Sequence, residues 1–264
     1  MDLKLSGKRA FISGSTAGIG FGVARMLLAE GVEVIINGRT MEGVESAMER
    51  LKKENPEAKV TGLAADFSDK KSVSHLIAQL PEVDILINNV GIYIGKTFEE
   101  TTDEDWYRQI EVNLMSGIRL SKHFLPRMIR KNWGRILFVS SECATLVPEE
   151  LFAYSVTKTA LLAVSRGLAQ KTKGSAVTVN VVLPGSTLTE GARKFLADQA
   201  IQEQKTVSEV EADFFSDVRT SSLLQRFASV EEVAGTITYL VSPLSSATNG
   251  AAIRIDGGST GGIL

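Results

Sequence analysis

The sequence has little of what disulfide-bonded, metal-binding or membrane-spanning proteins need. It contains one cysteine, Cys143, and two histidines, His75 and His123, so no disulfide can form within the chain and no ligands have metal-site spacing. No apolar run approaches the roughly 20 residues that span a bilayer, and no signal-peptide-like apolar core precedes the first predicted strand. We therefore expect a cytoplasmic protein that binds neither a metal nor a membrane.

An excess of charge of one sign is also missing. The 29 Lys and Arg residues are balanced by 31 Asp and Glu residues, and no basic block stands out. Such a chain lacks the electrostatic footprint of a protein that binds nucleic acid or an anionic membrane. The hydrophobic fraction of 44% in 264 residues is ordinary for a globular protein. We expect a single domain over residues 1–264, in which any phosphate-bearing ligand is held by local geometry.

Short apolar runs alternate with longer amphipathic segments, which is the rhythm of βαβ units. The predicted strands are residues 9–13, 33–37, 59–65, 83–88, 134–140, 176–183 and 251–255. The predicted helices are residues 18–30, 41–54, 70–79, 103–131, 152–171 and 230–240. The sequence thus predicts an α/β fold with a doubly wound, mostly parallel seven-stranded sheet of the Rossmann type and helices on both faces.

One stretch, residues 186–228, departs from this rhythm. It begins after an abrupt stop at Pro184-Gly185, and it is rich in Glu, Gln, Lys and Phe at helical spacing. We interpret residues 190–226 as a helical flap that closes over the substrate. The alternative is a permanently packed helical insertion, since long connections in compact domains are either functional or ordered.

The first predicted strand leads into three glycines, Gly14, Gly18 and Gly20, in the order Gly-x-x-x-Gly-x-Gly. Glycine permits positive φ and lets backbone N–H groups approach a pyrophosphate at a helix N-terminus, where the dipole favours anions. The spacing alone is also compatible with a tight strand-to-helix turn. Its position after the first strand favours a dinucleotide site.

The second strand is followed by Gly38-Arg39-Thr40, without the acid that NAD enzymes commonly use to bind the ribose 2′-hydroxyl. Arg39 can pair with a 2′-phosphate through its planar guanidinium, although it could also be a solvated loop arginine. A carboxylate at this place would repel the phosphate. The end of the strand therefore indicates NADP(H), with NAD(H) as the alternative.

Tyr154 and Lys158 lie four residues apart in the helix after the fifth strand, so both project from one face. A free tyrosine titrates at about 10, so proton exchange near neutrality needs a nearby cation that favours the phenolate. Lys158 is placed to lower the pKa of Tyr154 in this way.

With these residues the chain resembles the short-chain dehydrogenase/reductase family over nearly its whole length. Further matching motifs, in chain order, are Asp66, Asn88-Asn89-Val90-Gly91, Asn113, Ser140-Ser141, Asn180, Pro184-Gly185 and Asp256-Gly257-Gly258. Two positions depart from the family's pattern. Val90 stands where Ala is usual, and Ala17 lacks the basic residue that some NADP-preferring members carry in the glycine turn, so the NADP prediction depends on Arg39.

The resemblance implies a role for each matching residue. Tyr154 would be the general acid/base, Lys158 would lower its pKa and bind the nicotinamide ribose, and Ser141 would hydrogen-bond the substrate oxygen. Asn113 would hold a water that links Lys158 to solvent, although its amide could simply satisfy buried backbone. Asp66 would contact the adenine amino group. The predicted cofactor-binding residues are Gly14, Ser15, Thr16, Gly18, Ile19, Gly20, Arg39, Asp66, Phe67, Asn89, Gly91, Tyr154, Lys158, Pro184, Gly185, Thr187 and Thr189.

The resemblance further implies an oxidoreductase that transfers a hydride between a nicotinamide cofactor and a small-molecule ketone or secondary alcohol. Two alternatives stay open: an NAD-dependent sugar or polyol dehydrogenase, and a non-catalytic nucleotide-binding protein. The family also implies a homo-oligomer, a dimer or a tetramer, formed through helices 103–131 and 152–171. Glu142, Glu149 and Glu150 would disfavour an anionic substrate if they faced inward, but we expect them at a solvated rim.

Overall fold

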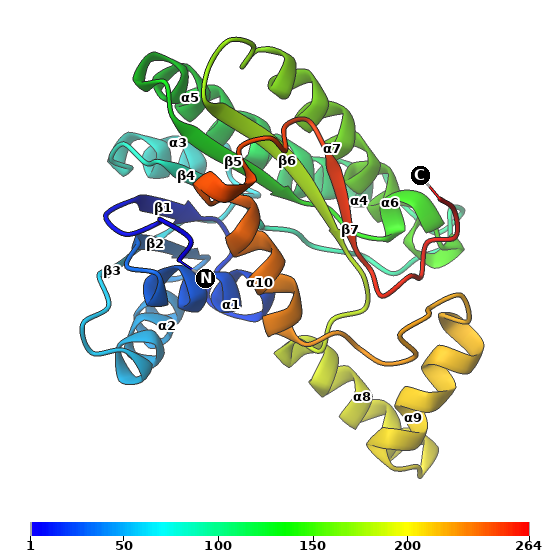
Figure 1. Cartoon of the computed structure of the whole chain (residues 1–264). Coiled ribbons are helices and arrows are strands. Elements are labelled where there is room, and N and C mark those ends of the chain that lie inside the picture. Colours follow the sequence, from blue (N-terminus) through cyan, green and yellow to red (C-terminus); the bar gives the residue numbers. More distant parts are fainter. Residues whose placement is uncertain (1, 264) are drawn as a thin grey trace.

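The computed structural model describes residues 2–263, which are built around one parallel sheet (Figure 1). The strand order is β3-β2-β1-β4-β5-β6-β7, and every neighbouring pair is parallel. The strands are β1 (Arg9–Ile12), β2 (Glu33–Gly38), β3 (Val60–Ala64), β4 (Ile85–Asn88), β5 (Gly134–Val139), β6 (Val177–Pro184) and β7 (Ala252–Ile255). The predicted doubly wound α/β fold is confirmed. The strand order reverses between β1 and β4, which is where a doubly wound sheet opens a crevice for a ligand.

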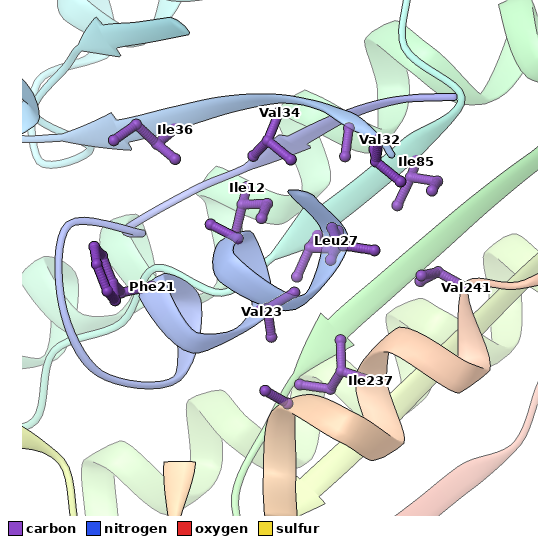
Figure 2. Packing of buried hydrophobic residues seen from close by; sticks show 14 of the residues in the cluster. Ile12, Phe21, Val23, Leu27, Val32, Val34, Ile36, Ile85, Ile237 and Val241 are labelled. Carbon is purple, nitrogen blue, oxygen red and sulfur yellow. The ribbon is translucent and has the colours of Figure 1, made fainter. Parts of the chain in front are cut away.

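Helices cover both faces of the sheet. On one face lie α1 (Gly18–Ala29), α2 (Met41–Glu54) and α10 (Val230–Leu240), and on the other lie α3 (Lys70–Gln79), α5 (Ser116–Lys131) and α7 (Phe152–Gln170). Successive strand residues alternate between the two cores, so Ile12 packs with the first helix layer and Phe11 with the second. Figure 2 shows Ile12 beside Val23 and Leu27 of α1. Burial on both faces explains why the strands are nearly continuous apolar runs.

The predicted single helix over residues 103–131 is interrupted. It begins as α4 (Asp103–Gln109), passes through a π-helical turn, η1 (Ile110–Met115), and continues as α5. Thr102 starts it with a capping box to Asp105, and Asn132 in the left-handed region ends it. A π-turn inserts a wider hydrogen-bonded ring without breaking the helical rise, so the apolar spacing on either side gives no sign of it.

Three short elements were not predicted. They are the one-turn helix α6 (Cys143–Leu146) and the 3₁₀ turns η2 (Glu149–Leu151) and η4 (Pro243–Ser245). Each is too short to show a hydrophobic period.

The stretch 186–228 forms α8 (Glu190–Glu203), α9 (Val207–Asp213) and the π-helical turn η3 (Phe214–Val218), which lie apart from the two helix layers (Figure 1). Their apolar side chains pack together as Leu196, Ala200, Val210, Phe215 and Phe227, with Leu188, Ala192 and Phe214 alongside. A parallel bridge between Thr187 and Ala228 joins the two ends of the stretch. We call residues 190–218 the helical segment.

Candidate active site

The glycine turn between β1 and α1 is braced by polar side chains from two neighbouring strands. Gly14 has φ +62°, and a Cβ there would lie 2.9 Å from the Val90 Cα. Its N–H donates to Asn37 Oδ1 (3.1 Å), and its carbonyl accepts from Asn89 Nδ2 (2.7 Å). A Cβ on Gly20 would lie 2.5 Å from that same amide nitrogen, so only glycine fits. Hydrogen bonds and close packing therefore hold the glycine turn in one conformation.

Ser13 and Asn37, which the sequence did not single out, hold this turn, and so does Ser15. The Ser13 hydroxyl accepts from the backbone N–H groups of Asn89 and Val90 (3.0 and 3.1 Å). The Ser15 hydroxyl donates to the Ile12 carbonyl (2.8 Å) and is fully buried, so it faces the protein and not the crevice. The sequence signal that could have identified Ser13 and Asn37 is a polar residue at the end of an otherwise apolar strand. Such a buried polar group must find a hydrogen-bond partner.

One cavity of about 330 Å³ lies beside the glycine turn and the ends of β2 and β3. Its lining includes these predicted cofactor residues: Gly14, Thr16, Arg39, Asp66, Phe67, Asn89 and Gly91. Arg108 of α4, which was not predicted, also lines it. Hydrogen bonds from the Ser68 backbone and hydroxyl lower the pKa of Asp66, and the charges of Arg39 and Arg108 act in the same direction. Two cations and one carboxylate thus stand together at this end.

A second cavity, of about 350 Å³, contains the predicted reactive side chains. It is lined by Ile19, Asn89, Gly91, Ile92, Tyr93, Val139, Ser140, Ser141, Tyr154, Lys158, Pro184, Gly185, Thr187 and Thr189. Asn89, Gly91 and Ile92 also line the first cavity, so the two adjoin. The arrangement is one groove that runs from Arg39 to Tyr154 across the carboxyl ends of the strands.

Tyr154 and Lys158 both project from α7 into this cavity, with the Lys158 Nζ 5.4 Å from the centre of the tyrosine ring. Burial raises the pKa of Tyr154 above its ordinary value, and the Ser141 hydroxyl opposes this rise. Burial also lowers the pKa of Lys158 to about 8. The direction of the Tyr154 shift is opposite to the lowering that the sequence predicted, because removal from water is the largest influence on the Tyr154 hydroxyl.

The Lys158 ammonium donates a hydrogen bond to a backbone carbonyl, and the missing side chain of Gly91 leaves space for it. Its Nζ donates to the Val139 carbonyl (2.9 Å), and the Lys158 carbonyl accepts from the Ser140 hydroxyl (2.8 Å). A Cβ on Gly91 would lie 3.1 Å from Nζ. Ser140 thus anchors α7 to β5, while neighbouring Ser141 faces the cavity.

Asn113 lies in the π-turn η1, and its side chain is almost fully used by the protein. Its Nδ2 donates to the Ile92 carbonyl (2.9 Å) and to the Thr157 hydroxyl (3.0 Å), while its Oδ1 accepts from the Ile92 N–H (2.8 Å). One lone pair of Oδ1 is left for a water. The predicted water relay stays a prediction. The hydrogen bonds to Ile92 support the alternative, which is that this amide satisfies buried backbone groups.

Ser141 is the second residue after β5, and its Oγ accepts from the Cys143 N–H (3.2 Å). Its own proton is thereby left for another acceptor. The neighbouring Glu142 is buried, contrary to the expected solvated rim, because it pairs with Arg219 through Nε and Oε1 (2.9 Å). Glu149 and Glu150 are exposed as expected.

Thr187 and Thr189 line the second cavity but use their hydroxyls locally. The Thr187 hydroxyl donates to the Gly185 carbonyl (2.9 Å), and Thr189 caps α8 by accepting from the Ala192 N–H (3.2 Å). The start of the helical segment is therefore built into the wall of the groove.

Metal ligands and membrane-spanning helices are both missing from residues 2–263. Within this range no three His, Cys, Asp or Glu side chains gather as metal ligands would. No helix of the described chain is long and apolar enough to cross a bilayer.

Comparisons with known proteins agree over nearly the whole chain. A family model described as short chain dehydrogenase matches residues 8–200. An uncharacterised oxidoreductase of Bacillus subtilis, YvaG, is 46% identical over 258 residues, 98% of each chain. A 3-oxoacyl-(acyl-carrier-protein) reductase of Aquifex aeolicus, FabG, is 30% identical over 262 residues, 98% of this chain and 99% of that one. The crystal structure of L-sorbose reductase from Gluconobacter frateurii, complexed with NADPH and L-sorbose, matches with a TM-score of 0.92 and 28% identity over 100% of both chains.

Proposed function

The chain belongs to the short-chain dehydrogenase family and is an oxidoreductase of CH–OH and C=O groups, and on that premise we propose that it uses NADP(H) to interconvert a ketone and a secondary alcohol. The observation that carries this proposal is the single groove that joins Arg39 at one end to Ser141, Tyr154 and Lys158 at the other. A nucleotide and a reacting carbon would meet in such a groove.

The residues present fit a dinucleotide. The Gly18 N–H at the N-terminus of α1 donates to a carboxylate oxygen, Glu190 Oε2 (2.8 Å), so this end of the helix binds an anionic group where a pyrophosphate would lie. Arg39 and Arg108 supply positive charge beside the first cavity, where a 2′-phosphate would bind. When bound, the cofactor would supply or accept the hydride. NADPH is also the cofactor named for the sorbose reductase structure.

At the other end of the groove, the protein's side chains would protonate and hydrogen-bond the substrate oxygen. The Tyr154 hydroxyl, kept protonated by a raised pKa, would donate its proton to an oxygen that becomes negative. Ser141 would donate a hydrogen bond to the same oxygen, so the two hydroxyls form a preorganised pair. Lys158, with a pKa of about 8, would carry its charge at neutral pH and hold the ribose hydroxyls beside Tyr154.

The alternatives make different demands on the groove. An NAD-dependent sugar or polyol dehydrogenase would have no use for cations where the 2′-phosphate would bind. A non-catalytic nucleotide-binding protein would have no need to bury Lys158 beside Tyr154, because burial of a charge is costly. Both arguments favour a working NADP(H) enzyme.

The test is a steady-state assay of NADPH oxidation and NADP⁺ reduction with a panel of small ketones, ketoses, 3-oxoacyl thioesters and the matching alcohols. Ketoses and 3-oxoacyl thioesters belong in the panel because similar proteins are named for them. We expect turnover with NADPH at a higher kcat/KM than with NADH. Equal kcat/KM values for the two nucleotides would reject NADP(H) preference, and no turnover with any member would reject carbonyl reduction of these classes.

We also propose that the protein is a cytoplasmic homo-oligomer, as the family resemblance implied. The proposed contact is the outer surface of α4, α5 and α7, where Tyr107 and Val156 are exposed apolar side chains. Light scattering at micromolar protein should give twice or four times the 28.5 kDa chain mass. A monomer at that concentration would reject the proposal.

A further inference from the structure

Glu142 is a buried acid directly after the predicted catalytic serine. Only 3% of its surface is exposed, and its backbone N–H donates to the Pro184 carbonyl (2.8 Å), which ties the end of β5 to the end of β6. One carboxylate oxygen, Oε2, is buried without a hydrogen-bond partner. The sequence and the proposed reaction give this residue no role.

Three separate parts of the chain meet at the other oxygen, Oε1. Arg219, the residue after η3, donates from Nε (2.9 Å), and Ser186, in the loop that leads to Thr187 and Thr189, donates from its hydroxyl (3.3 Å). The carboxylate itself comes from the segment that carries Ser141. The residue that follows the helical segment, the wall of the groove and the stretch that carries the predicted catalytic serine are thus joined through one atom.

Stability alone does not account for this pair. A buried ion pair is often no better than an apolar pair of the same volume, because both charges lose their hydration. In this pair the attraction offsets even less of the lost hydration, since Arg219 contacts Glu142 through Nε only and Oε2 has no hydrogen-bond partner. A Cβ on Gly185 would lie 2.8 Å from Oε2, so the acid is pressed against the backbone of the groove wall. This position indicates that the pair fixes geometry rather than adding stability.

We propose that Glu142 is a positioning residue for Ser141, and that Arg219 makes this positioning depend on the docked helical segment. The inference rests on the proposed function for the role of Ser141. With Arg219 in place, Glu142 holds the backbone at the end of β5, and the Cys143 N–H bonds the Ser141 hydroxyl (3.2 Å) so that its proton faces the cavity. Without Arg219, the buried carboxylate loses its countercharge and this backbone relaxes.

The kinetic test compares Glu142→Gln, Arg219→Met and the double variant with the full-length protein. We expect each single change to lower kcat by about tenfold or more while the dissociation constant for NADPH changes by less than about twofold, since the nucleotide end of the groove is untouched. Because the two residues act as one unit, the double variant should be no worse than the worse single variant. Arg226→Met, which breaks an exposed ion pair to Glu232, is the matched control and should leave kcat unchanged.

A second readout needs no turnover. Hydrogen exchange at the Cys143 amide reports the bond to the Ser141 hydroxyl, and it should speed up in Glu142→Gln and Arg219→Met but not in Arg226→Met. If the wild-type protein reduces none of the panel substrates, the proposed function fails while this measurement still tests the positioning. Unchanged exchange at Cys143, additive effects on kcat, or an equal loss in Arg226→Met would each overturn the inference.

Discussion

The side-chain amide of Asn113 bonds both backbone groups of Ile92. The Ile92 N–H donates to Oδ1 (2.8 Å), and the Ile92 carbonyl accepts from Nδ2 (2.9 Å). Ile92 lines both cavities of the groove, so this pair fixes the place where they adjoin. Because Asn113 lies in the π-turn η1, the irregular turn in the helix has a structural role, which is to aim this amide at the loop after β4.

Asn113→Asp should destabilise the protein by about 1–3 kcal/mol, because a carboxylate oxygen would then face the Ile92 carbonyl where a donor is needed. Denaturant unfolding measures the change. Asn55→Asp is the control, since the Asn55 side chain only accepts from Glu57 N–H (3.2 Å) and an aspartate can do the same. A loss no larger than in the control would contradict the bonding described above.

Tyr154→Phe should reduce turnover by about 10²-fold or more, because the ring is kept and only the proton-transferring hydroxyl is removed. NADPH binding, measured by fluorescence titration, should persist. Tyr239→Phe, a change at an exposed tyrosine on α10, should have no effect. If Tyr154→Phe keeps a substantial fraction of the wild-type rate, Tyr154 is not the general acid.

Arg39→Ala should weaken NADPH binding by about tenfold or more, as expected for a lost hydrogen bond to a charged group, and leave NADH binding unchanged. Arg108→Ala should act in the same direction, since Arg108 lines the same cavity. Arg130→Ala, at an exposed arginine in the last turn of α5, serves as the control. Equal losses for both nucleotides would remove the reason for preferring NADP(H).

Lys158→Met should abolish turnover yet stabilise the protein at pH 7, by on the order of 1–3 kcal/mol. The pKa of Lys158 falls from 10.5 to about 8 on folding, so the unfolded chain binds the extra proton between these values. The free energy of unfolding of the wild-type protein therefore rises with pH between about 8 and 10.5, and the full cost of burying the Lys158 charge is present below pH 8. Thermal unfolding at several pH values measures it. The gain should shrink toward pH 10.5, and Lys171→Met at the exposed end of α7 should show none. A Lys158→Met variant less stable than wild type at pH 7 would contradict the cost of burying this charge.

The helical segment should exchange its amide hydrogens faster than the sheet, and NADPH with a substrate analogue should slow that exchange. Its apolar cluster is small, and the bridge from Thr187 to Ala228 leaves the helices joined to the body mainly at their ends. Hydrogen exchange with and without ligands decides between a flap and a permanently packed insertion. High protection in the free protein that ligands leave unchanged would support the insertion.

Hydrophobic periodicity was enough to predict the sheet and its layers. The bounds of α2, α3 and α10 were predicted to the residue because each has a clear polar cap, such as Thr40 before α2 and Ser229 before α10. The π-turn η1 could not be predicted, because the group that its Asn113 bonds, the backbone of Ile92, lies 21 residues away in the chain.

The candidate site could be predicted only where residues form a motif. Tyr154, Lys158 and the glycine turn carry fixed spacings, and the structure brings them to one groove. Arg108 carries no such spacing, since it reaches the groove only through the way α4 packs. The buried Glu142 pairs with Arg219, 77 residues later in the chain, and no local pattern reports so distant a partner.

The apolar cluster of Leu196, Ala200, Val210, Phe215 and Phe227 shares none of these residues with the two cores that flank the sheet. Such a separation has an evolutionary consequence. Substitutions inside the cluster would lower its own small stability and leave the nucleotide crevice intact, since distant sites contribute to stability almost independently. The chain could therefore diversify its choice of substrate by rebuilding this one unit, and a library confined to residues 191–218, which keeps Glu190 on the Gly18 N–H of the glycine turn, would retain folded, nucleotide-binding members at high frequency.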